Sequence, residues 1–332
     1  MRTTCENRTI RAECDGKAGN RGKRAAGIGG TSRLRPGLRT CARSAFLGAG
    51  TVVALALSAA AAKAGAEDKS RYTLFDPTPD RLLRDLTTDR PDTTESPFTV
   101  DAGHVQIETN LFGYTRSRPD ADGTKTSSAE FATTNLRIGL TNATEVNVVW
   151  QPYGIVRSHP SDPADATRNA GIGGVDLRAK INLWGNDAFE TPGATAFGLL
   201  PYITLPTKRG NGVSPDDVSG GLILPFAVVL TDKFELGLNT GVSAVRNEGG
   251  ASYRAEWLAS ASLSYALSET IGTYYEIAGR FGTQNPLGDI VVLGTGVTYR
   301  LGRNLQLDGG VNFGVTNAAD RINPFVGVTA RF

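Results

Sequence analysis

The sequence is poor in the residues that most often carry chemistry. It contains three cysteines, Cys5, Cys14 and Cys41, and two histidines, His104 and His159. All three cysteines precede an apolar run at 45–62, so the rest of the chain has no disulfide framework and no thiol nucleophile. Two imidazoles without cysteine do not form a recognisable zinc-ligand set. We therefore expect no metal site, no cofactor and no catalytic residue.

Charged residues are also scarce, at 20% of the chain, where a typical soluble domain has about a quarter. The apolar run at 45–62 is uncharged, and Ala64-Gly65-Ala66 follows it as a small-residue cleavage site. Basic residues precede the run, at Arg33, Arg35, Arg39 and Arg43. This order is typical of a secretory signal. A membrane anchor is the alternative, although the run is barely long enough to span a bilayer. We assign residues 1–66 to an N-terminal extension and signal peptide.

Removal of residues 1–66 changes the charge balance. That segment holds 12 of the 35 basic residues and 3 of the 33 acidic residues. The remainder then has 23 basic and 30 acidic residues, a net charge of −7 instead of +2. A nucleic-acid partner is therefore not expected, because its only basic support lies in the removed segment.

The last stretch of the sequence shows the clearest pattern. From Asn304 to Phe332, apolar residues alternate with polar or small ones, interrupted by one polar turn at 317–320. A period of two with unlike faces indicates strands with different environments on their two sides. A final strand that ends on an aromatic residue is typical of an outer-membrane barrel, in which it pairs with the first strand. We expect outer-membrane lipid as one partner, and the barrel assembly machinery as another, through the strand ending at Phe332.

Alternation continues from Val100 to the end and predicts twelve strands. We place them at 102–115, 130–141, 144–157, 173–185, 194–207, 218–231, 233–246, 253–267, 270–283, 289–301, 304–316 and 321–332. The connections alternate between short turns and longer polar loops, which is the layout of a transmembrane antiparallel β-barrel. A soluble β-sandwich or lipocalin-like barrel is the alternative, but its inner face would be apolar. The predicted fold is an all-β outer-membrane barrel over residues 100–332.

The parity of the strands separates a lumen face from a lipid face. Charges are expected inside, because a charge at the bilayer midplane costs about 2–4 kcal/mol. The predicted lumen or constriction residues are Glu108, Arg137, Glu145, Asp176, Arg178, Lys180, Glu256, Glu276, Arg280, Arg300 and Asp308. They either hold the lumen shape or select solutes by size and charge. The predicted aromatic girdle residues are Phe234, Trp257, Tyr265, Phe281, Tyr299 and Phe332.

The polar segment 67–99 precedes the barrel. It is rich in proline and contains Asp89, Arg90, Asp92 and Glu95 within one short stretch. One interpretation is a solvated periplasmic leader. The other is a segment folded into the barrel mouth, where these four residues pair with lumen charges.

Four motifs resemble a known family. They are TDRPDTTESPFTVDAGHVQIE (88–108), GGVDLRAKINLWG (173–185), LLPYITLPT (199–207) and GGLILPFAVVL (220–230). The sequence over residues 88–332 is similar to the Gram-negative outer-membrane transporter family named for the phenol-degradation meta-pathway. The resemblance implies a monomeric outer-membrane barrel that admits small, hydrophobic or aromatic solutes.

The sequence therefore predicts a porin-like outer-membrane channel for passive uptake of small solutes. One alternative is a barrel phospholipase-type enzyme, because His159 and Ser161 have the spacing of a histidine that activates a serine. Another is a closed structural or surface-recognition barrel that uses its loops at 116–128 and 158–172.

Overall fold

The computed structural model describes residues 68–332, except 121, 248–249 and 286–287. The predicted signal peptide lies outside the described residues. The strands are β1 (Val105–Arg116), β2 (Lys125–Thr141), β3 (Thr144–Trp150), β4 (Tyr153–His159), β5 (Thr167–Gly171), β6 (Val175–Trp184), β7 (Thr195–Leu205), β8 (Ser219–Thr231), β9 (Phe234–Arg246), β10 (Tyr253–Ala266), β11 (Ile271–Phe281), β12 (Ile290–Arg300), β13 (Leu305–Gly314) and β14 (Ile322–Arg331). Two short 3-10 turns, η1 (Asp80–Leu82) and η2 (Pro163–Asp165), complete the elements. No helix among the described residues is long and apolar enough to cross a membrane.

The strands form one closed antiparallel sheet. From β6 to β14 each strand pairs with the next, and β1 pairs with both β2 and β14, which closes the ring. Two of the twelve strand positions in the barrel are each occupied by two shorter strands, one by β3 and β4 and the next by β5 and β6. β2 pairs with β4 along its first half and with β3 along its second, while β4 pairs with β5 and β3 with β6. The prediction of a closed twelve-stranded barrel is therefore confirmed.

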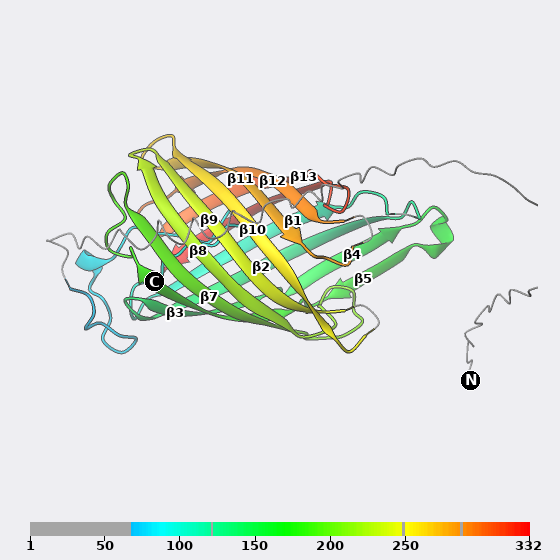
Figure 1. Cartoon of the computed structure of the whole chain (residues 1–332), viewed down its shortest axis with the longest axis horizontal. Helices are drawn as coiled ribbons and strands as arrows, with labels where there is room; N and C mark the ends of the chain where they lie inside the picture. The colour runs from blue at the N-terminus through cyan, green and yellow to red at the C-terminus, as the bar shows by residue number, and fades with distance from the viewer. Residues whose placement is uncertain (1–67, 121, 248–249, 286–287) are drawn as a thin grey trace, which may run out of the picture. The chain divides into compact units, whose positions relative to one another are not determined.

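The two ends of the barrel differ in the length of their connections. At the end that holds the C-terminus, β2 and β3 are joined by two residues, as are β8 and β9. At the other end β4 and β5 reach past the neighbouring strands (Figure 1). The loops predicted at 116–128 and 158–172 are longer than the loops in the structure. Strands continue into 125–128 and 157–159, and β5 occupies 167–171, because exposed polar residues can pair in a hairpin beyond the membrane as readily as they form a loop.

Burial is inverted relative to a soluble protein. On β11, Tyr275 and Ile277 are 60% and 51% exposed, whereas Tyr274 and Glu276 are each 3% exposed. Alternate side chains on a strand point to opposite faces, so the exposed apolar face points outward and the polar face inward. Such a surface requires lipid around it. Among the expected girdle residues, Trp257 lies opposite Phe281 and Phe234 lies opposite Tyr265 in the sheet register. Tyr299 and Phe332 are 45% and 70% exposed.

Adjacent positions on β10 provide a test of this assignment. Trp257 should be quenched by brominated lipids in a protein whose other tryptophans are replaced by Trp150→Phe and Trp184→Phe, because it is 57% exposed on the outward face. A matched protein with Trp257→Phe and Leu258→Trp places the indole on the inward face. There we expect quenching by aqueous acrylamide and little by lipid. Equal lipid quenching of the two proteins would contradict the assignment.

Candidate functional site

The segment before β1 runs inside the barrel. We call residues 87–100 the plug. Its groups contact β1, β2, β3 and β6 on one side of the ring. They also contact β9, β10, β11 and β13 on the other side. Because these strands lie around the whole circumference, one short segment reaches all of them only from within. The plug therefore occupies the lumen.

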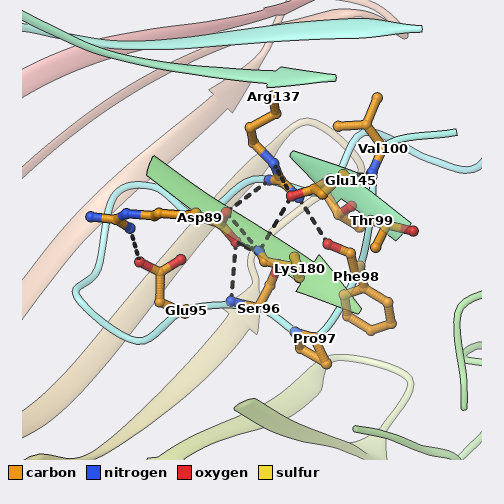
Figure 2. Close-up of polar contacts among 12 residues, drawn as sticks. Asp89, Glu95, Ser96, Pro97, Phe98, Thr99, Val100, Arg137, Glu145 and Lys180 are labelled. Carbon is orange, nitrogen blue, oxygen red and sulfur yellow. Dashed lines mark hydrogen bonds and ion pairs between the residues drawn. The ribbon is translucent and has the colours of Figure 1, made fainter. Parts of the chain in front are cut away.

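A cluster of buried charges centred on Arg137 fixes one side of the plug (Figure 2). The Arg137 side chain is fully buried and lies 2.9 Å from Glu145, 2.8 Å from Glu108 and 3.1 Å from Asp89. It also donates a hydrogen bond to the carbonyl of Phe98 at 2.8 Å. A buried guanidinium requires partners of opposite charge, and here two come from the barrel wall and one from the plug.

Asp89 links the plug to a second buried cation. Its carboxylate accepts hydrogen bonds from Lys180 at 2.6 and 2.7 Å, and Figure 2 shows it between Lys180 and Arg137. Ser96 donates to the same carboxylate at 2.7 Å, which folds the plug back on itself. Glu145, in turn, accepts the backbone N–H of Val100 at 2.6 Å. The predicted residues Glu108, Arg137, Glu145 and Lys180 thus meet in one cluster, joined by Asp89.

Other predicted residues contact the plug individually. Arg90 forms an ion pair with Asp308 of β13 at 2.8 Å. Glu95 forms one with Arg178 of β6 at 2.6 Å, and Arg178 also pairs with Asp176 at 2.7 Å. Glu276 of β11 forms no ion pair within the described part of the chain. It accepts hydrogen bonds from the backbone and hydroxyl of Thr93 and from the hydroxyl of Thr94.

Three predicted residues lie away from the plug. Arg280 and Glu256 pair at 2.6 Å, and Arg254 also contacts Glu256. Arg300 lies 3.9 Å from Asp85, which precedes the plug and is 86% exposed. The expected lumen charges therefore do not form a single constriction. They divide into the Arg137 cluster, separate contacts with the plug, and pairs outside it.

The parity argument considered charges and so missed neutral groups that contact the plug. Asn239 exchanges two hydrogen bonds with the backbone of Glu95, at 2.7 and 2.9 Å. Asn182 donates to the carbonyl of Pro97, and the hydroxyls of Ser260 and Thr94 share a hydrogen bond at 2.8 Å, in which Ser260 donates because the Thr94 proton goes to Glu276. A usable signal existed for two of them, because Asn182 shares its parity with Lys180 on β6 and Ser260 shares its parity with Glu256 on β10. No predicted charge lies on β9, the strand of Asn239.

A second set of charges anchors the leader at the end of the barrel that holds the C-terminus. Arg84 pairs with Asp187 in the β6–β7 turn at 3.1 Å and with Asp101 at 3.4 Å. Lys69 lies 2.8 Å from Asp187. Burial alone would raise the pKa of the Asp187 carboxyl, but the adjacent Arg84 guanidinium holds it below its ordinary value. The turn is the longest at this end, and it binds the leader through this carboxylate.

A cavity of about 760 Å³ lies on the opposite side of the plug from the Arg137 cluster. Leader and plug residues 81–88, 90–92 and 94–98 border it on one side, together with the β6–β7 turn, and residues of β8 to β12 line the other. The strand residues on that side include several small ones, namely Ala227, Gly237, Ser262, Ser264, Gly272 and Thr298. The lumen is therefore filled by ion pairs on one side and hollow on the other.

The described residues offer little for bond-making chemistry. No group of three or more His, Cys, Asp or Glu side chains among them is arranged to hold a metal ion. His159 Nε2 lies 3.2 Å from the hydroxyl of Ser127, while the Ser161 hydroxyl donates to the carbonyl of Asp122 at 3.4 Å. The arrangement can bind, exclude or pass a solute, and most of its charged groups other than Glu276 form ion pairs with one another.

The Arg137 cluster generates a stability prediction. Arg137→Met should lower the free energy of unfolding by about 3–5 kcal/mol, because it leaves several buried carboxylates short of a cation. Arg300→Met, a matched change at a partly exposed pair, should alter it by less than about 1 kcal/mol. Urea unfolding in detergent micelles measures both. Adding Glu145→Gln to Arg137→Met should recover part of the loss, and no loss in Arg137→Met would show that the cluster does not stabilise the barrel.

Comparisons with known proteins agree with this geometry. The family described as "Putative MetA-pathway of phenol degradation" matches residues 88–332. Among solved structures, an outer membrane channel from Pseudomonas putida F1 superposes with a TM-score of 0.57 and 12% identity, covering 74% of this chain and 100% of that chain. A search of curated proteins found no match.

Two more distant structures share the barrel form. The transport unit of the autotransporter AIDA-I from Escherichia coli gives a TM-score of 0.45 at 10% identity, covering 76% of this chain and 93% of that one. The toluene transporter TbuX from Ralstonia pickettii gives 0.37 at 9% identity, covering 69% and 88%. Neither score supports an inference. The family match spans most of the chain, so this protein is an outer-membrane β-barrel that belongs to the family described as "Putative MetA-pathway of phenol degradation".

Proposed function

We propose that this protein is a passive outer-membrane channel for small hydrophobic solutes, aromatic ones included. The observation that carries the proposal is the plug: a short segment, held against the wall by noncovalent contacts, occupies a polar lumen beside a cavity of about 760 Å³. The plug continues directly into β1, but its contacts with the rest of the wall are noncovalent and can open without breaking a bond. Membership of a family named for phenol degradation and the fold shared with an outer membrane channel support the same choice.

The parts of the chain have separate roles in this proposal. Residues 1–66 direct export, residues 67–99 form the leader with its plug, and residues 100–332 form the barrel. The charges of the Arg137 cluster position the plug, and Asp176, Arg178, Glu256 and Arg280 set the charge along the lumen. The girdle aromatics seat the barrel in lipid, and the strand that ends at Phe332 is recognised by the barrel assembly machinery.

The proposed channel has no catalytic role. His159 and Ser161 are the pair on which a phospholipase reading depends, and their side chains have different partners, Ser127 and the carbonyl of Asp122. Ser127→Ala and Ser161→Ala should therefore leave solute uptake unchanged, and neither protein should differ from the parent in release of fatty acid from phospholipid vesicles. Loss of a hydrolase activity in either variant would instead support an enzyme.

Uptake of a fluorescent apolar dye tests the channel directly. Gram-negative cells that produce this protein should admit N-phenylnaphthylamine faster than cells with an empty vector, because the barrel offers a path past the outer leaflet. Entry of the charged, hydrophilic substrate nitrocefin, measured by periplasmic β-lactamase, serves as the control and should change little. No increase for the dye, with the barrel shown to be present by heat-modifiable gel migration, would favour a closed structural barrel.

A further inference from the structure

The plug is attached asymmetrically. Its ion pairs go to β2, β6 and β13: Asp89 with Arg137 and Lys180, Glu95 with Arg178, and Arg90 with Asp308. Among the described residues, no ion pair joins the plug to any strand from β7 to β12. Hydrogen bonds and one apolar contact, the packing of Phe98 on Ala196 and Ala227, hold that side. The hydrogen bonds run to Asn239, Ser260 and Glu276.

The Glu276 carboxylate is the main acceptor on the weakly attached side. It is 3% exposed and has no cation beside it within the described residues. Three donors from the plug stabilise its charge: the N–H of Thr93 at 3.1 Å and the hydroxyls of Thr93 and Thr94 at 2.8 and 2.5 Å. Water can replace all three if this part of the plug moves away, because a carboxylate is well solvated in water. If the part of the plug around Asp89 moved away, Arg137 and Lys180 would each lose a buried charged partner.

The hollow part of the lumen lies on the same side. Plug residues around Thr94 border the cavity, and the wall opposite them is lined by small side chains such as Gly237 and Ser262. The cavity extends to the end of the barrel near the C-terminus, where Lys233 and Arg300 also line it. A displacement of Thr93 and Thr94 would therefore join this cavity to the rest of the lumen without disturbing the Arg137 cluster.

One buried hydroxyl on this wall, Tyr274 Oη, has no hydrogen-bond partner among the described residues. Tyr274 is 3% exposed and lines the cavity, whereas the nearby Ser262 hydroxyl faces the Asp92 carboxyl of the plug. Buried polar groups usually form hydrogen bonds, so a hydroxyl without a partner beside a cavity can form one with a bound solute.

Apolar groups of Leu86 and Phe98 line the same cavity. Charged side chains, among them Glu235, Lys233 and Arg300, also line the cavity. The part next to Leu86, Phe98 and Tyr274 suits a small solute with an apolar body and a few hydrogen-bonding groups.

From this asymmetry we propose that the solute crosses between the plug and the wall formed by β8 to β12, and that the contacts of Thr93 and Thr94 with Ser260 and Glu276 open while those of the Arg137 cluster stay closed. This inference rests on the proposed channel function. It names the side of the plug that moves and the residues that the solute passes.

Engineered cross-links distinguish the two sides. Residues 67–332 contain no cysteine, so an introduced pair reacts without competition once residues 1–66 are removed. The first pair is Thr94→Cys with Ser260→Cys, whose hydroxyls lie 2.8 Å apart. The second is Thr99→Cys with Asn186→Cys, which joins the plug to the β6–β7 turn instead of to the β8–β12 wall; the Thr99 hydroxyl accepts from the Asn186 amide at 2.7 Å. Because Asn186 also lines the cavity, this pair is compared as a disulfide, which adds no bulk. Dibromobimane, which fluoresces when it bridges two thiols, reports closure of each pair.

Dye entry is then compared for each variant before and after bridging. Closure of the first pair, by dibromobimane or directly as a disulfide, should reduce N-phenylnaphthylamine entry to the level of cells without the protein. The disulfide adds no bulk to the lumen, so its reduction should restore dye entry. Closure of the second pair should leave entry unchanged.

Three outcomes would overturn the inference. If the first pair, closed as a disulfide, leaves entry unchanged, the solute passes elsewhere. If closing the second pair as a disulfide stops entry as completely as closing the first, the whole plug leaves the barrel. If the unmodified protein admits no dye at all, the proposed channel function fails, and the inference fails with it.

Discussion

The structure depends on the need of buried charges for partners in a narrow space. The barrel wall places Arg137 and Lys180 at full burial, with Glu108 and Glu145 beside them. The wall also supplies Asp308 and Arg178, which face the same space. These groups are close enough to repel or attract strongly in a region with little water, so any segment that enters must match their charges. The plug does so, placing Asp89 against two cations and Arg90 against a carboxylate.

The same requirement explains why the inside of the barrel is not a plain pore. A lumen lined by unpaired charges would remain filled with water and ions. Here most charges on one side form ion pairs with one another. The other side has a cavity whose strand residues include small and hydroxylated ones as well as Glu235 and Arg300. Polar and apolar surfaces therefore coexist within one lumen. This combination allows a segment to be held firmly at one edge and loosely at the other.

The period of two made the fold predictable from the sequence. On β11 the alternation of Ile277 and Tyr275 with Glu276 and Tyr274 is visible in the sequence, because lipid and water impose opposite preferences on neighbouring residues. Strand ends were less predictable. The segments β4 and β5 continue beyond the membrane, where both faces meet water and the alternation fades.

The site was predictable only in part. Parity selected charges such as Arg137 and Asp308, but it contained no information on which charge would meet which. The partner of Asp308 is Arg90, 218 residues earlier in the chain, and no local spacing encodes such a contact. Neutral partners such as Asn239 were missed because the argument used the cost of placing a charge in the membrane. That argument does not apply to an uncharged amide. Their position opposite the plug became evident only from the three-dimensional register.

The placement of the plug has a consequence for the order of assembly. The plug is synthesised before every strand, yet its contacts extend from Glu108 on β1 to Asp308 on β13. Its docking site is therefore incomplete until the chain has been released almost entirely from the export machinery. The plug is exported before all the strands but forms its native contacts only after them. Docking of the plug therefore requires that the barrel around it is complete.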